Sequence, residues 1–508
     1  MTAKFKTQVF YISLFVLSLF FVTRTVLLLP PEDAQLDNGS RLEWTSCWFN
    51  IPLFKIIHCA RLYPSLQNSQ QSISIPVVVI KNKGLIRKRE PIIYINGGPG
   101  YAVGIDSSYN IDYWVNNVDE YEWNRDFILY DNRGTGLSYP QPQCKELRDI
   151  NYKNLPKYVT EEEYYHELYE QAKICTQNVR EEVNQFNFST HHSTQDLRDL
   201  IDTLNYSSVN LFGVSYGTRV ALELMRRSPQ RLRSVILDSP FPSSVNNALA
   251  WPSVLDNTIQ KIFQYCENNK VCQEKYPNLK ALFTKALAEL KSNPMLVFLP
   301  EYYSDGHYEV FINDDRFVYA LFTAMYDSSL LPTLPDIIND VVQGKQKSMR
   351  QMITIYADTI MDNTANDMVY NFVLCNDNGD ITQDALESEI NKYPLLKYYN
   401  RLEWKYTHCK TVNEDPKLRL SKRPVKSSIP TLILSGVNDT ITPWQWGEEI
   451  NQHLENSSHY IVKEISHGVI GFDECALEIS RLFLKEPNNL SKQKCSTFIN
   501  SSSALQVK

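Results

Sequence analysis

One pentapeptide near the middle of the chain constrains the fold more than any other feature. Residues 213–217 read Gly-Val-Ser-Tyr-Gly; they directly follow the apolar run 209–212 and precede a helical pattern over about 218–227. A G-x-S-x-G sequence between a buried strand and a helix is typical of a strained turn that exposes a serine hydroxyl. Its glycines let the backbone pass close to neighbouring segments. We therefore predict that Ser215 is a nucleophile, the alternative being a chance pentapeptide in a glycine-bearing loop.

Short apolar segments recur along the chain, as expected for strands that are buried on both faces. The first five are residues 76–80, 92–95, 127–130, 209–212 and 235–237. Helical patterns lie between them, including one that Ser193 or Thr194 can cap and that runs to Leu204. This alternation predicts an α/β protein whose parallel sheet carries helices on both faces.

The pattern changes between about residues 243 and 425. Amphipathic segments such as 279–290 and 317–325 dominate there, and the strand signal returns only at 431–434 and 460–462. A chain of 508 residues is also too long for a single compact core. We therefore predict a large helical cap inserted before the last two strands. The expected division is a first core part at 44–243, the cap at 244–425 and a second core part at 426–498.

A glycine-rich turn, Gly97-Gly98-Pro99-Gly100, follows the predicted strand 92–95. An acyl-transfer enzyme needs two backbone N–H groups that point at the developing oxyanion. We expect one from Tyr216, directly after the nucleophile, and the other from Gly98, with Gly97 as the alternative. Without a nucleophile nearby, the same sequence would indicate only a tight turn.

A serine nucleophile needs a base, and the base needs a carboxylate that orients it. After a strand-turn-helix nucleophile, the acid and then the histidine follow in the chain, each at the end of a strand. Asp439 follows the predicted strand 431–434, and His467 follows the strand at 460–462. The other histidines lie upstream of Asp439 or before the end of the final strand. The predicted triad is therefore Ser215, Asp439 and His467, which requires no metal or organic cofactor.

The segment Asp131-Asn132-Arg133-Gly134 also ends a predicted strand. Its charges should emerge at the active-site edge of the sheet, because the carboxyl ends of parallel strands meet there. We expect an ionic network between Arg133 and Asp131 that braces neighbouring loops rather than a contact with the substrate.

The N-terminus has the pattern of an export signal. Lys4 and Lys6 precede the apolar run 9–22, within a predicted signal peptide or signal anchor at residues 1–30. The run is short for a membrane span of about 20 residues. We expect an exported protein, either secreted, periplasmic, or attached to a membrane through this segment with its catalytic domain outside the cytosol.

The ten cysteines agree with export, because disulfides are the usual state of cysteines outside the cytosol. No cysteine and histidine pattern has zinc-site spacing. We expect neighbours to pair, since each loop is then short: 47–59, 144–175, 266–272, 375–409 and 475–495. The chain also has N-x-S/T sequons at Asn38, Asn187, Asn205, Asn438, Asn456, Asn489 and Asn500. The net charge of −7 and the absence of a basic patch give no reason to expect a nucleic acid as a partner.

Three motifs together resemble one enzyme family. N-G-G-P-G, D-N-R-G-T-G-L-S and G-V-S-Y-G-T-R resemble the proline iminopeptidase and tripeptidyl aminopeptidase group of α/β-hydrolases. The resemblance continues through 436–443 and 466–468 and extends from about residue 44 to 495. It implies an α/β-hydrolase fold and a serine peptidase that releases short prolyl or tripeptidyl units from peptides with a free N-terminus. The cap segments 316–344 and 374–377 are more similar to the exported tripeptidyl aminopeptidases than to the short cytosolic branch.

Two departures from the family concern substrate binding. Asn96 stands where the family often has histidine, and the Trp-Glu pair that binds the substrate amine in the short branch is absent. Two alternatives therefore stay open. One is an esterase or lipase with the same triad, since a fold does not fix its substrate. The other is a non-catalytic binding protein, which usually lacks a triad residue.

An aminopeptidase must also bind a protonated amine, and a buried ammonium without a partner is costly. Asp377, in the cap segment Leu374-Cys375-Asn376-Asp377, is the candidate for this contact. The alternative is that Asp377 caps a turn with Asn378-Gly379.

Overall fold

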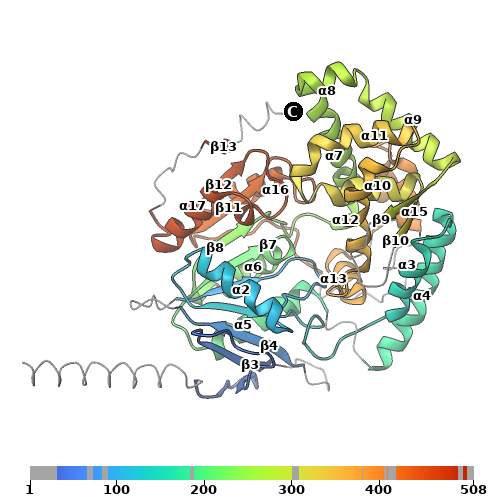
Figure 1. The fold of residues 1–508 in the computed structure, drawn as a ribbon. Coiled ribbons are helices and arrows are strands. Elements are labelled where there is room, and N and C mark those ends of the chain that lie inside the picture. The colour runs from blue at the N-terminus through green and yellow to red at the C-terminus, as the bar shows by residue number, and fades with distance from the viewer. Residues whose placement is uncertain are drawn as a thin grey trace, which may run out of the picture.

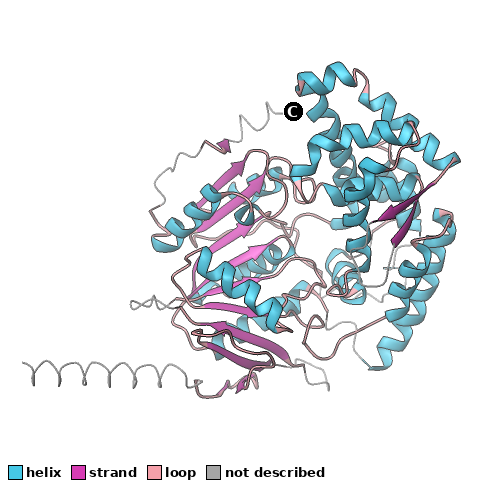
Figure 2. Ribbon diagram, in the orientation of Figure 1, coloured by secondary structure: helices cyan, strands magenta, loops and turns pink. Residues whose placement is uncertain are grey.

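The computed structural model describes residues 31–65, 73–82, 90–182, 188–299, 308–379, 381–405, 409, 419–489 and 496–499. Within these residues it contains one 11-stranded sheet, a separate two-stranded ribbon and many helices (Figures 1 and 2). No helix in the described part of the chain is long and apolar enough to cross a membrane. The predicted leader, residues 1–30, lies outside the described residues.

The large sheet has the order β1-β2-β3-β4-β6-β5-β7-β8-β11-β12-β13. Its strands are β1 (Ala34–Gln35), β2 (Arg41–Thr45), β3 (Ile57–Tyr63), β4 (Ile75–Ile80), β5 (Ile92–Ile95), β6 (Phe127–Tyr130), β7 (Val209–Val214), β8 (Leu232–Asp238), β11 (Thr431–Gly436), β12 (Ser457–Val462) and β13 (Phe498–Ile499). From β6 to β12 each neighbouring pair is parallel, and the strands at both ends of the sheet pair antiparallel.

The apolar runs of the sequence therefore became the buried strands, as predicted. The strands β3 and β13 carry no such run. β3 includes His58 and Arg61, and β13 has two residues. Because β13 pairs with β12, the described residues form three strands after the insertion rather than the predicted two.

Helices cover both faces of the sheet. The core helices are α2 (Ser108–Glu120), α5 (Thr190–Thr203), α6 (Tyr216–Arg227), α16 (Trp444–Asn451) and α17 (Glu474–Lys485). Side chains alternate between the faces, as the period of a strand requires. Val77 and Val79 of β4 lie in the same apolar cluster as α5 and α6, whereas Val78 and Ile80 lie with α2 and α17.

The cap of α5 differs from the prediction. The helix begins one turn earlier, with Ser189 as its N-cap. The Ser189 hydroxyl accepts a hydrogen bond from the backbone N–H of His192, which has no partner within the helix. Ser193 and Thr194 lie inside the helix, and the Thr194 hydroxyl donates back to the carbonyl oxygen of Thr190 at 2.8 Å.

A helical insertion lies between β8 and β11 and has its own apolar core (Figure 1). It comprises α7 (Asn247–Asn268), α8 (Lys270–Lys275), α9 (Leu279–Ser292), β9 (Met295–Leu299), β10 (Tyr308–Ile312), α10 (Asp314–Ala324), α11 (Leu334–Val342), α12 (Arg350–Met361), α13 (Asp367–Asn378), α14 (Gln383–Ile390) and α15 (Lys397–Lys405). Two earlier helices, α3 (Lys145–Asn154) and α4 (Glu161–Glu182), pack against α12 and α15. Residues that precede Ser215 in the chain therefore also belong to the helical layer.

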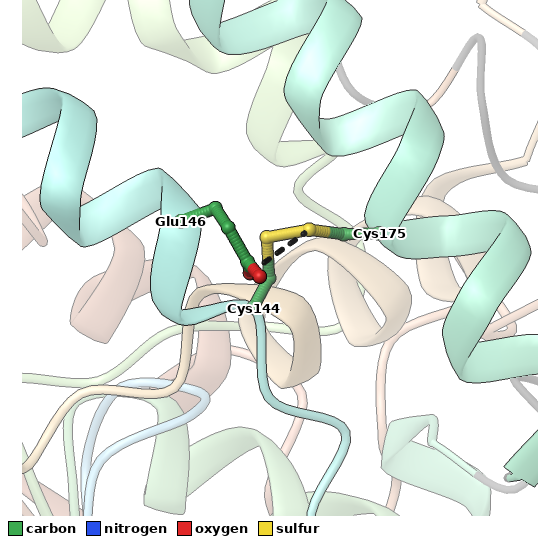
Figure 3. A group of neighbouring side chains, drawn as sticks. All are labelled: Cys144, Glu146 and Cys175. Atoms are coloured by element: carbon green, nitrogen blue, oxygen red, sulfur yellow. Dashed lines mark hydrogen bonds between the residues drawn. A yellow bond between two sulfur atoms is a disulfide. The ribbon is translucent and has the colours of Figure 1, made fainter.

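Four of the expected disulfides are present: Cys47–Cys59, Cys144–Cys175, Cys266–Cys272 and Cys375–Cys409. Cys475 is disulfide-bonded as well, and Cys495 lies outside the described residues. Cys144, Cys175 and the carboxylate of Glu146 lie close enough together to resemble a metal site (Figure 3). Because the two sulfur atoms are bonded to each other, they supply no thiolate, and this group is a disulfide beside a carboxylate.

Candidate active site

Ser215 lies on the turn between β7 and α6, with φ of 54° and ψ of −122°. A non-glycine residue seldom adopts this conformation, and such strain is concentrated at functional sites. Close packing holds the turn in place. A Cβ atom at Gly217 would lie 2.1 Å from the carbonyl oxygen of Ile95, so no larger residue fits between α6 and the end of β5. The sequence motif has therefore formed the strained strand-to-helix turn that it predicts.

Asp439 and His467 come together from the ends of β11 and β12. Nδ1 of His467 donates to Oδ2 of Asp439 at 2.9 Å. The Asp439 carboxylate also accepts hydrogen bonds from the backbone N–H groups of Ile441 and Thr442, at 3.0 and 2.8 Å, and from the Thr442 hydroxyl at 2.7 Å. These bonds hold the Asp439 carboxylate in one orientation. The carboxylate in turn favours the tautomer of His467 in which Nδ1 carries the proton.

The electrostatic setting suits a general base. Burial alone would lower the pKa of His467, but the charge and hydrogen bond of Asp439, together with the charge of Asp238, raise it. With Nδ1–H donated to Asp439, Nε2 keeps its lone pair and can accept a proton. The ring of Tyr326, just after α10, meets His467 edge-on with centroids 5.3 Å apart.

The glycine turn lies against Ser215. A Cβ atom at Gly97 would be 3.3 Å from Cβ of Ser215, and Gly98 has φ of 117°. Tyr216 is the first residue of α6, where backbone N–H groups have no partner within the helix. Gly97, Gly98 and Tyr216 therefore lie around Ser215, as the oxyanion prediction requires.

These groups line one cavity of about 730 Å³, together with His467 and residues of the helical insertion. Its wall is rich in aromatic side chains, including Tyr101, Phe241, Trp251, Phe322 and Trp446. It also includes three aspartates: Asp362, Asp367 and Asp377. The volume is that of a site for an organic ligand, with a few polar groups in a mostly apolar wall.

Asp377 lies in this wall but already has hydrogen-bond partners. Its carboxylate accepts the backbone N–H of Thr190 at 3.0 Å and the Thr190 hydroxyl at 2.5 Å. Burial raises its pKa to about 6, although nearby Arg219 and the bonds from Thr190 oppose the shift. Helix α13 extends to Asn378, so the alternative in which Asp377 caps a turn is wrong.

The predicted ion pair between Arg133 and Asp131 is also wrong. Arg133 pairs with Asp196 of α5, and Nε of Arg133 donates to Oδ2 at 2.6 Å. The Asp131 carboxylate accepts the backbone N–H groups of Val103 and Leu137, both at 2.8 Å. One bond holds the carboxylate to its own loop at Leu137, and the other joins it to the segment after β5 at Val103. Both charges brace neighbouring segments, but through different partners.

Three residues close to Ser215 or His467 were not predicted: Asp238, Ser239 and Tyr326. Asp238 ends a buried strand, just as Ser215 and Asp439 follow one, so its position in the sequence was a usable signal. Tyr326 carried no such signal, because it comes from the insertion and meets His467 only in the folded chain.

Sequence comparison identifies the family. The profile of the alpha/beta hydrolase fold family matches residues 90–473. The chain belongs to the α/β-hydrolase family. Tripeptidyl aminopeptidase from Streptomyces coelicolor is 22% identical over 472 residues, covering 85% of this chain and 81% of that one. The enzyme of the same name from Streptomyces lividans is 21% identical with the same coverage.

Solved structures that match the chain include a peptidase and an esterase. A proline iminopeptidase from Mycobacterium smegmatis matches with a TM-score of 0.37 and 14% identity, covering 82% of this chain and 96% of that one. An esterase from Exiguobacterium antarcticum matches with a TM-score of 0.34 and 14% identity, covering 82% and 97%. The family match over residues 90–473 confirms the expected α/β-hydrolase fold and family.

Proposed function

We propose that this α/β-hydrolase is a serine peptidase that releases short N-terminal units, prolyl or tripeptidyl, from peptides with a free amino terminus. The observation that carries the proposal is the hydrogen bond between Asp439 and His467 beside a cavity that also contains Ser215. The two relatives named tripeptidyl aminopeptidase support the peptide substrate.

In the proposed mechanism, Ser215 attacks the scissile carbonyl carbon while Nε2 of His467 takes the hydroxyl proton. The backbone N–H groups of Gly98 and Tyr216 stabilise the oxyanion. His467 then protonates the leaving amine, and Asp439 stabilises the imidazolium throughout. Water, activated by the same histidine, hydrolyses the acyl-enzyme.

The substrate's ammonium group needs an anionic partner in the cavity. Asp377 is the first candidate, because it lies in the wall and Cys375, two residues before it, fastens α13 through a disulfide to Cys409. Its two hydrogen bonds from Thr190 fix the carboxylate without neutralising it. An ammonium would complete its coordination above about pH 6, where the side chain is ionised.

Asp362 and Asp367 form a second candidate. Backbone hydrogen bonds join the segment between these two aspartates to the end of the glycine turn and the residues that follow it. Ala102 donates to the carbonyl oxygen of Thr364 at 3.0 Å, and Asn366 donates to that of Gly100 at 2.8 Å. Asp367 is open to the cavity yet enclosed by protein, which raises its pKa, with Arg148 opposing.

Peptides that differ only at the amino terminus test this assignment. Asp377→Asn and Asp367→Asn are compared on a free-amine tripeptide anilide and on its N-acetylated analogue. Loss of a hydrogen bond to a charged group should raise KM for the free amine by roughly 10- to 100-fold and hardly change hydrolysis of the acetylated substrate. Asp384→Asn, an exposed first-turn aspartate of α14, is the matched control for Asp367. An equal loss on both substrates, or none on either, would remove the mutated residue from the amine site.

An esterase is the second candidate function, since the cavity wall is largely aromatic. The three aspartates in that wall argue against it, because a carboxylate has no role toward a neutral acyl chain. The purified protein should therefore hydrolyse free-amine peptides in preference to N-blocked peptides and short acyl esters. Preference for the esters would replace the peptidase proposal with an esterase.

We also propose that the catalytic part of the chain works outside the cytosol. The four described disulfides support this, because the reducing cytosol does not maintain them. Fractionation of cells that express the full chain, with and without residues 1–30, tests the proposed signal or anchor.

A further inference from the structure

Asp238, the last residue of β8, is hydrogen-bonded both to Ser215 and to the loop that follows His467. We propose that Asp238 is a positioning residue that holds the loop carrying His467 in register with the nucleophile turn. This inference rests on the proposed function, because it takes Ser215 as the nucleophile and His467 as the base.

The side chain of Asp238 fixes the backbone that follows His467. Its Oδ1 accepts the N–H of Val469 at 2.8 Å, and its Oδ2 accepts the N–H of Ile470 at 2.9 Å. The adjacent hydroxyl of Ser239 accepts the N–H of Gly468 at 2.9 Å. Three successive N–H groups after the catalytic histidine are therefore held by two consecutive residues.

The backbone of the same two residues fixes the nucleophile and the acid strand. The carbonyl oxygen of Asp238 accepts the N–H of Ser215 at 3.0 Å, and Ser239 donates its N–H to the carbonyl oxygen of Leu434 at 2.9 Å. β8 lies between β7, which leads to Ser215, and β11, which leads to Asp439. A shift at Asp238 would thus move the histidine loop relative to the serine.

Charge provides a second link between Asp238 and the histidine. Asp238 is 1% exposed, and burial raises its pKa to about 6, although its N–H partners and the charge of His467 oppose the shift. Above that pH it is a buried anion near the imidazole and favours the imidazolium. Among the described residues, the titratable groups that also face His467 are Asp439 and the neutral Tyr326, whose pKa is raised further by burial. The uncharged Thr442 hydroxyl lies 3.3 Å from Nδ1.

Asp131 provides a matched control within the same sheet. It follows β6 as Asp238 ends β8, is 1% exposed, accepts two backbone N–H groups, and has a pKa raised by burial to about 6. Its partners belong to Val103 and Leu137 rather than to the histidine loop. The two aspartates therefore share a structural role, and Asp238 alone is bonded to the segment after His467.

The test compares Asp238→Asn with Asp131→Asn in the full chain, on whichever peptide or ester the wild type hydrolyses best. An amide can accept only one of the two N–H groups at Asp238, so the loop should move. We expect kcat to fall about 10²-fold, as for a base displaced by about 1 Å, with little change in KM. The acid limb of the kcat profile should shift to lower pH, because an anion near the imidazole has been removed. Asp131→Asn should lower the melting temperature comparably and leave the acid limb in place.

Ser239→Ala is a milder variant, which keeps the inference testable if Asp238→Asn does not fold. It removes the bond from Gly468 and the bond that the Ser239 hydroxyl donates to Oδ1 of Asp238 at 3.2 Å, but it keeps the carboxylate and its bonds from Val469 and Ile470. The fall in kcat should therefore be smaller, and the acid limb should stay nearer its wild-type position than in Asp238→Asn. Wild-type kcat and pH profile in Asp238→Asn, or the same acid limb in both aspartate variants, would overturn the positioning role. A wild-type protein that hydrolyses nothing and does not react with a serine-directed probe would instead overturn the proposed function, and this inference with it.

Discussion

The carboxylate of Asp439 lies 2.9 Å from Nδ1 of His467, and three further hydrogen bonds from Ile441 and Thr442 prevent it from turning away. An amide at this position would keep the size of the side chain but would accept fewer of these bonds and favour the wrong imidazole tautomer. Asp439→Asn should therefore keep the fold and lose about 10⁴-fold in kcat, the loss known for the corresponding change in a reference serine protease. Unchanged circular dichroism with near-normal turnover would exclude Asp439 as the triad acid.

The sequon at Asn438 should carry no glycan in active protein. Its backbone N–H donates to the carbonyl oxygen of Ile465 at 2.9 Å, and its carbonyl oxygen accepts the Ser466 hydroxyl at 3.2 Å. Because the Asn438 side chain is half-buried and its backbone joins the acid loop to the histidine loop, a bulky sugar here should disturb the packing of the two loops. Glycopeptide mapping checks this, and a glycan found at Asn438 in active enzyme would contradict the arrangement.

The pH profile should reflect the raised pKa of His467. Catalysis needs the neutral imidazole, so activity is lost as the pH falls through this pKa. Because Asp439 and Asp238 raise the pKa, the acid limb of kcat/KM should lie above the ordinary histidine value of 6.5. A limb below 6.5 would show that burial, which acts in the opposite direction, dominates.

A non-reducing peptide map should join Cys475 to Cys495, in addition to the four described disulfides. Cys475 is disulfide-bonded, and the pairing of neighbours predicts its partner. Protein taken from its native compartment serves as the sample. Free thiols at most of the ten cysteines there would argue against export.

Sequence patterns predicted the central strands of the sheet well, but they predicted the outer strands and the start of a helix poorly. Buried parallel strands such as β5 and β6 have the same bounds in the prediction and in the structure, because both faces demand apolar residues. The start of α5 was misplaced by one turn, because the sequence offers several hydroxyl residues and only packing selects Ser189 as the cap.

In the candidate site, too, the sequence predicts some features and misses others. Chain order and strand ends were enough to predict that Asp439 and His467 lie together, because the fold fixes where strand ends meet. Partners of individual charges were not predictable. Arg133 pairs with Asp196, which is 63 residues away, because α5 packs beside the strand end. The roles of Asp238 and Tyr326 likewise depend on contacts between segments far apart in the chain.

Covalent labelling with a fluorophosphonate probe tests the central claim most directly, since such probes react with activated serine nucleophiles. Peptide mapping of the labelled protein should place the adduct on Ser215. Ser215→Ala and His467→Ala should each abolish turnover while keeping the fold, and Ser215→Ala should abolish labelling. An adduct on another serine, or full activity in either variant, would contradict the assignment of Ser215 and His467 as nucleophile and base.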